Sequence, residues 1–182
     1  MGPDFRRDDA ASIHAPERDL TSLDKARALA VVVPAALLAG AYGSEYWGGL
    51  YPCEMCWWQR YAHFAGLGFA LLSLLLARAP DRGRSFVWLA AFAILTSGGI
   101  GAYHAGVETG VFEGATQCTT NATAGLTGDA LLKAIMAAPI VRCDEVQFSF
   151  LGISMAGWNA ILSIFAALVI LWLSLRRPRA RP

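Results

Sequence analysis

Four long apolar stretches, separated by polar segments, dominate the pattern along the chain. They cover about residues 28–46, 57–77, 86–105 and 152–175, close to the roughly 20 apolar residues with which a helix crosses a bilayer. Pro34 in the first stretch and three glycines in the third are tolerated in membrane helices. The pattern therefore predicts an all-α membrane protein built as a bundle of four transmembrane helices.

The first stretch has an alternative interpretation as a cleaved signal peptide. Lys25 and Arg27 precede it, and residues 41–43 weakly resemble a cleavage site. However, a polar leader of 24 residues before Lys25 is long for such a signal, and cleavage would leave an odd number of spans. We therefore expect the first stretch to remain as a span.

A shorter segment, residues 127–140, lies between the third and fourth stretches. Its apolar residues Leu131, Leu132, Ile135 and Met136 recur at helical spacing, and Pro139 ends the pattern. The segment is too short to span a bilayer. It predicts a short amphipathic helix on the outer membrane surface.

Composition and charge agree with a membrane protein and exclude two other classes. Hydrophobic residues make up 55% of the chain and charged residues 16%, whereas soluble domains carry about 25% charged residues. Such a composition is too apolar for a disordered chain. With 15 Lys and Arg against 14 Asp and Glu, the chain also lacks the basic field of a nucleic-acid-binding protein.

The basic residues predict how the bundle is oriented, since cytoplasmic segments are enriched in Lys and Arg. Twelve of the 15 basic residues lie before the first stretch, between the second and third, or after the fourth. We therefore expect residues 1–24 to be a mobile cytoplasmic tail, residues 25–176 the transmembrane domain and residues 177–182 a basic cytoplasmic tail. The loops at about 47–56 and 106–151 then face outward.

All four cysteines lie in the two outward segments. They are Cys53, Cys56, Cys118 and Cys143. Because an oxidising outer compartment lets disulfides persist, we predict two disulfide-capable pairs, Cys53 with Cys56 and Cys118 with Cys143.

Cys53 and Cys56 form a C-x-x-C motif at the mouth of the second span. Cys56 lies in the first turn of the predicted helix, where the positive end of the helix dipole favours a thiolate. Alternatives are a static disulfide and half of a metal site. Zinc prefers four ligands at paired spacing, whereas the other two cysteines are 25 residues apart without an adjacent histidine, so we expect no metal.

Arg60 lies four residues after Cys56, on the same helix face and one turn away. A charge inside a span is costly and points to function, although an arginine at this depth can also extend to the outer headgroups. We expect its guanidinium to stabilise a Cys56 thiolate or to donate to a carbonyl oxygen of a bound electron acceptor. His104 lies at similar depth in the third span and can line the same site.

Two motifs resemble the signatures of DsbB, the family of bacterial inner-membrane disulfide oxidases. Residues 52–60, PCEMCWWQR, resemble its P-C-x-x-C-x-x-[EQ]-R pattern, and residues 143–152, CDEVQFSFLG, followed by Trp158, resemble its second signature. The resemblance covers about residues 27–175. The related vitamin K epoxide reductase group carries its C-x-x-C near a later span and fits less well.

The resemblance implies a quinone-dependent protein disulfide oxidoreductase in the bacterial inner membrane. Such proteins reoxidise a periplasmic thioredoxin-like partner of the DsbA type and pass the electrons to ubiquinone or menaquinone. By position, Cys118 matches the cysteine that forms a mixed disulfide with the partner, and Cys143 matches its disulfide mate. Cys53 and Cys56 match the pair that receives the electrons, with Cys56 beside the quinone.

The resemblance also implies a quinone site that contains Arg60, the neighbouring Gln59, and His104. Two other functions remain open from the sequence. One is a membrane scaffold with purely structural disulfides. The other is a thiol oxidoreductase of the same fold that serves a dedicated partner or works in the reducing direction.

Overall fold

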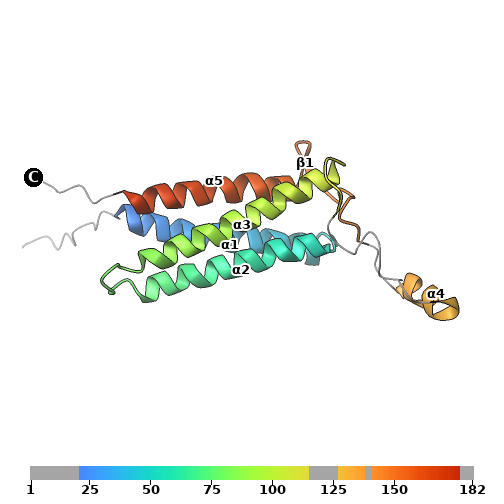
Figure 1. Ribbon diagram of the computed structural model, residues 1–182, viewed down its shortest axis with the longest axis horizontal. Coiled ribbons are helices and arrows are strands. Elements are labelled where there is room, and N and C mark those ends of the chain that lie inside the picture. Colours follow the sequence, from blue (N-terminus) through green and yellow to red (C-terminus); the bar gives the residue numbers. More distant parts are fainter. Residues whose placement is uncertain (1–20, 115–126, 138–140, 177–182) are drawn as a thin grey trace, which may run out of the picture.

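The computed structural model describes residues 21–114, 127–137 and 141–176. Within them lie the long helices α1 (Ser22–Tyr46), α2 (Glu54–Leu75), α3 (Arg84–Glu108) and α5 (Met155–Leu175), the short helix α4 (Gly128–Ala137), and the strands β1 (Ser149–Phe150) and β2 (Ile153–Ser154). The long helices lie side by side along the longest axis of the molecule, and α4 lies apart from them at one end (Figure 1). The two predicted tails fall largely outside the described residues, as does Cys118.

The structure confirms a mostly helical protein with membrane-type helices. Among the described residues, α1, α3 and α5 are long and apolar enough to cross a membrane. The helix α2 has 22 residues but is not among these three, because its first half contains the polar residues Gln59, Arg60 and His63, which are buried. The helix α4 lies within the segment for which the sequence predicts a short helix.

The helix α1 begins at Ser22, several residues before the predicted start of the first span. Thr21 caps it: the Thr21 hydroxyl accepts a hydrogen bond from the Asp24 amide, and the Asp24 carboxylate accepts one from the Thr21 amide. This reciprocal capping satisfies two amide donors that the helix itself leaves unpaired. The polar residues Asp24 and Lys25 are therefore part of the helix.

A β-hairpin precedes α5, which the apolar pattern did not predict. Strands β1 and β2 pair antiparallel, and the turn between them places Leu151 and Gly152 at φ values of 53° and 76°. Two successive positive φ values are typical of tight hairpin turns. The Trp158 indole donates to the Phe150 carbonyl at 3.0 Å and so holds the hairpin against α5. Ser154 then caps α5, accepting from the Gly157 amide at 3.1 Å.

Glycines allow α3 to pack closely against both of its neighbours. A Cβ atom on Gly101 would lie 2.9 Å from the Ala156 carbonyl oxygen of α5, and one on Gly66 would lie 3.2 Å from Ile94 of α3. Close backbone approach at small residues is a main source of helix association in membranes. It brings the start of α5 and the end of α3 into direct contact, beside the first half of α2 with its cysteines and His63.

Polar contacts tie the helices together at the opposite end of the bundle. The buried Arg27 guanidinium donates to Asp24 at 2.8 Å and also to the Arg82 carbonyl in the α2–α3 connection. The Trp88 indole of α3 donates to the Ser174 hydroxyl of α5 at 2.9 Å. Between the two ends lies a core cluster of small and aliphatic side chains: Leu23, Ala26, Ala30, Ala70, Val87, Ala90, Ala91, Ile94, Ala167 and Ile170.

Candidate functional site

The C-x-x-C motif forms the start of α2. Cys53 is the N-cap residue, and its sulfur accepts a hydrogen bond from the Cys56 amide at 3.4 Å. The Cys53 thiol in turn lies 3.3 Å from Cys56 Sγ and donates to it. Pro52, immediately before the cap, restricts the backbone that enters the helix. This spacing puts both sulfurs at the positive end of the α2 dipole, where negative charge on sulfur is stabilised.

The two sulfurs differ in how readily they ionise. The hydrogen bond that the Cys53 thiol makes with Cys56, together with its burial, raises the pKa of Cys53 to about 12 and outweighs the opposite effect of His104. An ordinary cysteine thiol has a pKa of about 8.5. Cys53 therefore keeps its proton at neutral pH, and Cys56 is the member of the pair that receives this hydrogen bond.

We expect iodoacetamide to modify Cys56 of the reduced protein before Cys53 between about pH 7 and 9, because the thiolate is the nucleophile. The rate of Cys53 modification should keep rising with pH until the pH approaches its pKa of about 12. Steric shielding of a buried thiol alone would lower the rate but would not produce this pH dependence. Since the Cys53 thiol ionises less readily in the folded state than in the unfolded state, the reduced protein should also lose folding stability as the pH rises above about 9. Quenched labelling with peptide mass spectrometry measures both rates.

The control for this experiment is the same protein unfolded in detergent and urea. There both thiols should titrate near about 8.5 and react alike. Faster modification of Cys53 than of Cys56 in the folded protein at pH 8 would contradict the assignment.

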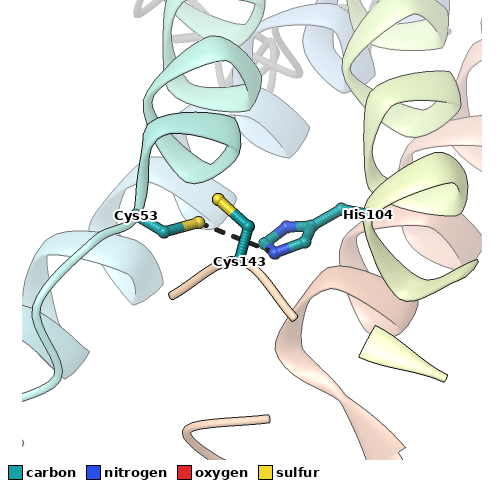
Figure 2. A group of neighbouring side chains, drawn as sticks. All are labelled: Cys53, His104 and Cys143. Carbon is teal, nitrogen blue, oxygen red and sulfur yellow. Dashed lines mark hydrogen bonds between the residues drawn. The ribbon is translucent and has the colours of Figure 1, made fainter. Parts of the chain in front are cut away.

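His104 of α3 and Cys143 of the loop before β1 lie beside Cys53 (Figure 2). Cys53 Sγ is 3.6 Å from His104 Nε2, and one ligand atom from each of the three residues lies within 4.8 Å of the others. All three residues are buried. The structure therefore brings together one member of each predicted cysteine pair and the predicted histidine. Cys118 lies outside the described residues.

A chain of side-chain hydrogen bonds extends from His104 into the bundle. The Gln59 amide nitrogen lies 3.1 Å from His104 Nδ1, and the Gln59 amide oxygen accepts from Asn159 of α5 at 2.7 Å. The Asn159 oxygen lies 2.9 Å from Nε2 of His63. At the other nitrogen of His104, the Glu108 carboxylate lies 3.9 Å away. These contacts hold the Gln59 and His104 side chains in defined orientations.

Arg60 forms an ion pair with α1. Its guanidinium donates to the Glu45 carboxylate at 2.5 Å and to the Ala41 carbonyl at 3.1 Å. The side chains of Arg60 and Glu45 are 6% and 17% exposed, so water screens the pair little. The guanidinium also lies over the rings of Tyr42 and Trp57, 4.6 and 5.0 Å from their centroids. Arg60 is therefore anchored within the bundle, with its hydrogen bonds directed to α1.

A mainly apolar cavity of about 300 Å³ connects these groups. Its polar lining includes Cys53, Cys56, Gln59, Arg60, His63, His104 and Asn159, and its apolar walls include Leu37, Leu38, Phe148, Phe150 and Trp158. Ligand sites typically combine apolar walls with a few convergent polar groups. This cavity can hold a flat, uncharged ring against sulfur, guanidinium and imidazole groups.

Sequence reasoning did not identify Glu45, Glu108 or Asn159 as part of the site. Glu45 and Glu108 are acidic residues at the ends of apolar stretches, and a rule that flags ionisable groups near spans would have found them. Glu108 is notable because its Oε2 atom is buried and finds no hydrogen-bond partner among the described residues. Asn159 carries no comparable signal, since a single amide in an apolar helix is usually a packing residue.

The amino-acid sequence is similar to those of known proteins. The profile of the family "Disulfide bond formation protein DsbB" matches residues 24–173. Disulfide bond formation protein B of Marinobacter nauticus is 30% identical over 165 residues, covering 85% of this chain and 92% of the relative. The protein of the same name from Paracidovorax citrulli is 31% identical over 166 residues, covering 84% and 89%.

An uncharacterized protein of Rickettsia prowazekii is also similar, at 26% identity over 152 residues, with coverage of 82% and 86%. No solved structure matches the chain. The family profile covers most of the chain, including the C-x-x-C motif, Arg60, His104 and Cys143. The chain therefore belongs to the DsbB family of disulfide bond formation proteins.

Proposed function

We propose that this protein reoxidises a periplasmic thioredoxin-like dithiol partner of the DsbA type and passes the electrons to a membrane quinone. The observation that carries the proposal is the cavity that Cys56 and Arg60 share at the start of α2. A sulfur at a helix N-terminus is stabilised as a thiolate and can give up electrons. A buried guanidinium in the same cavity can bind the oxygen of the acceptor.

The proposed setting is the bacterial inner membrane, with α2 as a fourth span beside α1, α3 and α5. Its polar residues Gln59, Arg60 and His63 are buried inside the bundle, which removes much of their cost in a bilayer. Basic residues cluster at the bundle end that holds Arg27 and Arg82, favouring cytoplasmic termini. Figure 1 shows α4 apart from the bundle at the opposite end, which becomes the periplasmic end, where the helix can bind the membrane surface.

The proposed exchange begins when a partner thiolate attacks Cys118 of the Cys118–Cys143 disulfide, forming a mixed disulfide and releasing the Cys143 thiolate. Cys143 then attacks Cys53, forming a Cys143–Cys53 disulfide and releasing the Cys56 thiolate. The closeness of Cys143 to Cys53 supports this order. The buried, proton-holding character of Cys53 and the helix-stabilised position of Cys56 make Cys56 the better leaving thiolate.

The cycle closes when the second partner thiol attacks the partner sulfur of the mixed disulfide, which releases oxidised partner and the Cys118 thiolate. Cys118 then attacks Cys143, which restores the Cys118–Cys143 disulfide and returns Cys53 to the thiol. Re-formation of the Cys53–Cys56 disulfide releases two electrons and two protons. A quinone supplies the two-electron oxidising capacity and leaves as quinol.

The cavity lining fits a quinone ring. Arg60 has five N–H donors, of which Glu45 and Ala41 receive two, and it can direct another toward a ring carbonyl. Within the described residues, His63 Nδ1 is buried in the lining without a hydrogen-bond partner. Gln59 holds His104 in place beside Cys53. Leu37, Leu38 and Phe148 supply apolar contacts to the ring.

An anaerobic turnover assay tests the function. Purified protein in detergent is mixed with a short-chain ubiquinone or menaquinone and a reduced thioredoxin-like periplasmic dithiol protein. We expect loss of quinone absorbance in proportion to the partner disulfide formed, one quinone per dithiol. Mixtures with pre-oxidised partner or without the membrane protein serve as controls. Absence of quinone reduction with every such pair would overturn the proposal.

A further inference from the structure

Three groups that bind soft metal ions converge at the start of α2. Cys53 belongs to the N-cap of α2, His104 to α3 and Cys143 to the loop before β1, so the cluster forms only in the folded chain. In Figure 2 the two sulfurs and the imidazole project into the same space. Cys53 Sγ and His104 Nε2 are 3.6 Å apart, and the three ligand atoms lie within 4.8 Å of one another.

These separations suit tetrahedral zinc. Zinc binds sulfur at about 2.3 Å and imidazole nitrogen at about 2.0 Å, which places tetrahedral ligand atoms roughly 3.5–3.8 Å apart. The distance between Cys53 Sγ and His104 Nε2 already falls in this range. The remaining separations need to shorten by at most about 1.3 Å, a change that rotation of the Cys143 side chain in the loop can supply.

The charge of the ligand set also favours a divalent cation. Two thiolates balance the two positive charges of Zn²⁺, so the occupied cluster is neutral. A neutral cluster can occupy this buried position without the large cost of an uncompensated charge. Thiolate and imidazole are the ligands that select zinc and related thiophilic metals over magnesium or calcium.

We propose that the reduced protein binds one Zn²⁺ ion through Cys53, His104 and Cys143, with water in the fourth position. This binding goes beyond the proposed electron transfer and does not depend on a quinone. Because it occupies Cys53 and Cys143 together, bound zinc blocks the exchange between these sulfurs. Zinc is thus an inhibitor specific to the reduced state.

The second nitrogen of His104 gives the proposal a further consequence. Metal binding at Nε2 leaves the ring proton on Nδ1, next to the Gln59 side chain. Gln59 then has to turn its oxygen toward this proton, whereas a carboxylate at the same position accepts it in either orientation. A carboxylate partner also raises the basicity of a ligating histidine. The substitution Gln59→Glu therefore tightens metal binding.

Cobalt titration of tag-free, full-length protein tests the proposal, since Co²⁺ replaces Zn²⁺ and reports thiolate ligands by absorbance. Protein reduced by a phosphine and desalted anaerobically should bind one equivalent of Co²⁺, with a thiolate-to-cobalt charge-transfer band that Zn²⁺ abolishes. Cys143→Ser and His104→Ala should weaken binding at least about tenfold, and Gln59→Glu should strengthen it several-fold. His14→Ala is the matched control, because residue 14 lies in the N-terminal tail that the sequence predicts to be cytoplasmic, and it should keep the cobalt affinity.

Oxidised wild-type protein provides a comparison that involves no substitution. After diamide oxidation and desalting, we expect the charge-transfer band to disappear while the circular dichroism spectrum is unchanged. The proposal is overturned if reduced wild-type protein shows no such band, if oxidised protein binds equally well, or if a folded Cys143→Ser variant keeps the wild-type affinity. None of these readouts involves quinone, so failure of the proposed electron transfer remains a separate result.

Discussion

The substitution Cys56→Ser should abolish quinone reduction, lowering the rate by about 10³-fold or more, as expected when a group that performs the chemical step is removed. The hydroxyl that replaces the thiol cannot release electrons by forming a disulfide with Cys53. The partner-driven reaction and direct reduction by dithiothreitol should both fail. Quinone absorbance, followed anaerobically in the assay described above, measures the two rates.

The substitution Cys143→Ser should be compared with Cys56→Ser, because it removes the sulfur that exchanges with Cys53 and leaves the Cys53–Cys56 pair intact. Partner-driven turnover should fall to background, whereas dithiothreitol should still reduce the Cys53–Cys56 disulfide and deliver electrons to quinone. In Cys56→Ser, the neighbouring sulfurs of Cys53 and Cys143 should accumulate as a disulfide that thiol trapping detects. Quinone reduction by dithiothreitol in a folded Cys56→Ser protein would contradict the assigned role of Cys56.

The second large effect is expected at Arg60, whose substitution by methionine should impair both stability and quinone use. Removing the guanidinium leaves the Glu45 carboxylate largely buried without its cation, which typically costs about 3 kcal/mol or more. A lost hydrogen bond from a charged donor to a quinone oxygen costs about 1.5–3 kcal/mol, equivalent to a 10–150-fold rise in the KM for quinone. Unfolding in mixed micelles and steady-state kinetics measure the two effects.

The double variant Arg60→Met with Glu45→Gln separates the two contributions. Neutralising Glu45 removes the unpaired charge, so much of the lost stability should return. The KM for quinone should stay raised, because the donor is still missing. Full recovery of quinone use in the double variant would show that Arg60 acts only by supporting the fold.

Much of the fold follows from local sequence. The four apolar stretches correspond to α1, α2, α3 and α5, because long runs of apolar residues satisfy their backbone groups as helices. The start of α1 at Ser22 is also predictable from the sequence, since Thr21 and Asp24 have the spacing of a capping box. The hairpin before α5 is not predictable from the local sequence, because Leu151 adopts a positive φ that its residue type does not favour.

The candidate site also contains residues that the sequence predicts and residues that it does not. The C-x-x-C motif and Arg60 lie within one helix, and their spacing alone predicts a shared face. In contrast, Glu45 and Asn159 reach Arg60 and Gln59 from other helices. Contacts between helices depend on how each helix is rotated and translated against its neighbours, which apolar periodicity does not specify.

Apolar runs and residue spacings within single segments are enough to predict a helical membrane protein with a cysteine pair at a helix start. The contacts of Cys53 with Cys143 and His104, and the ion pair of Glu45 with Arg60, join different segments and emerge from the folded chain. Those contacts depend on close packing at residues such as Gly66 and Gly101, which sets how α2, α3 and α5 meet. The same packing turns two separate cysteine motifs into one buried cluster of sulfur and imidazole.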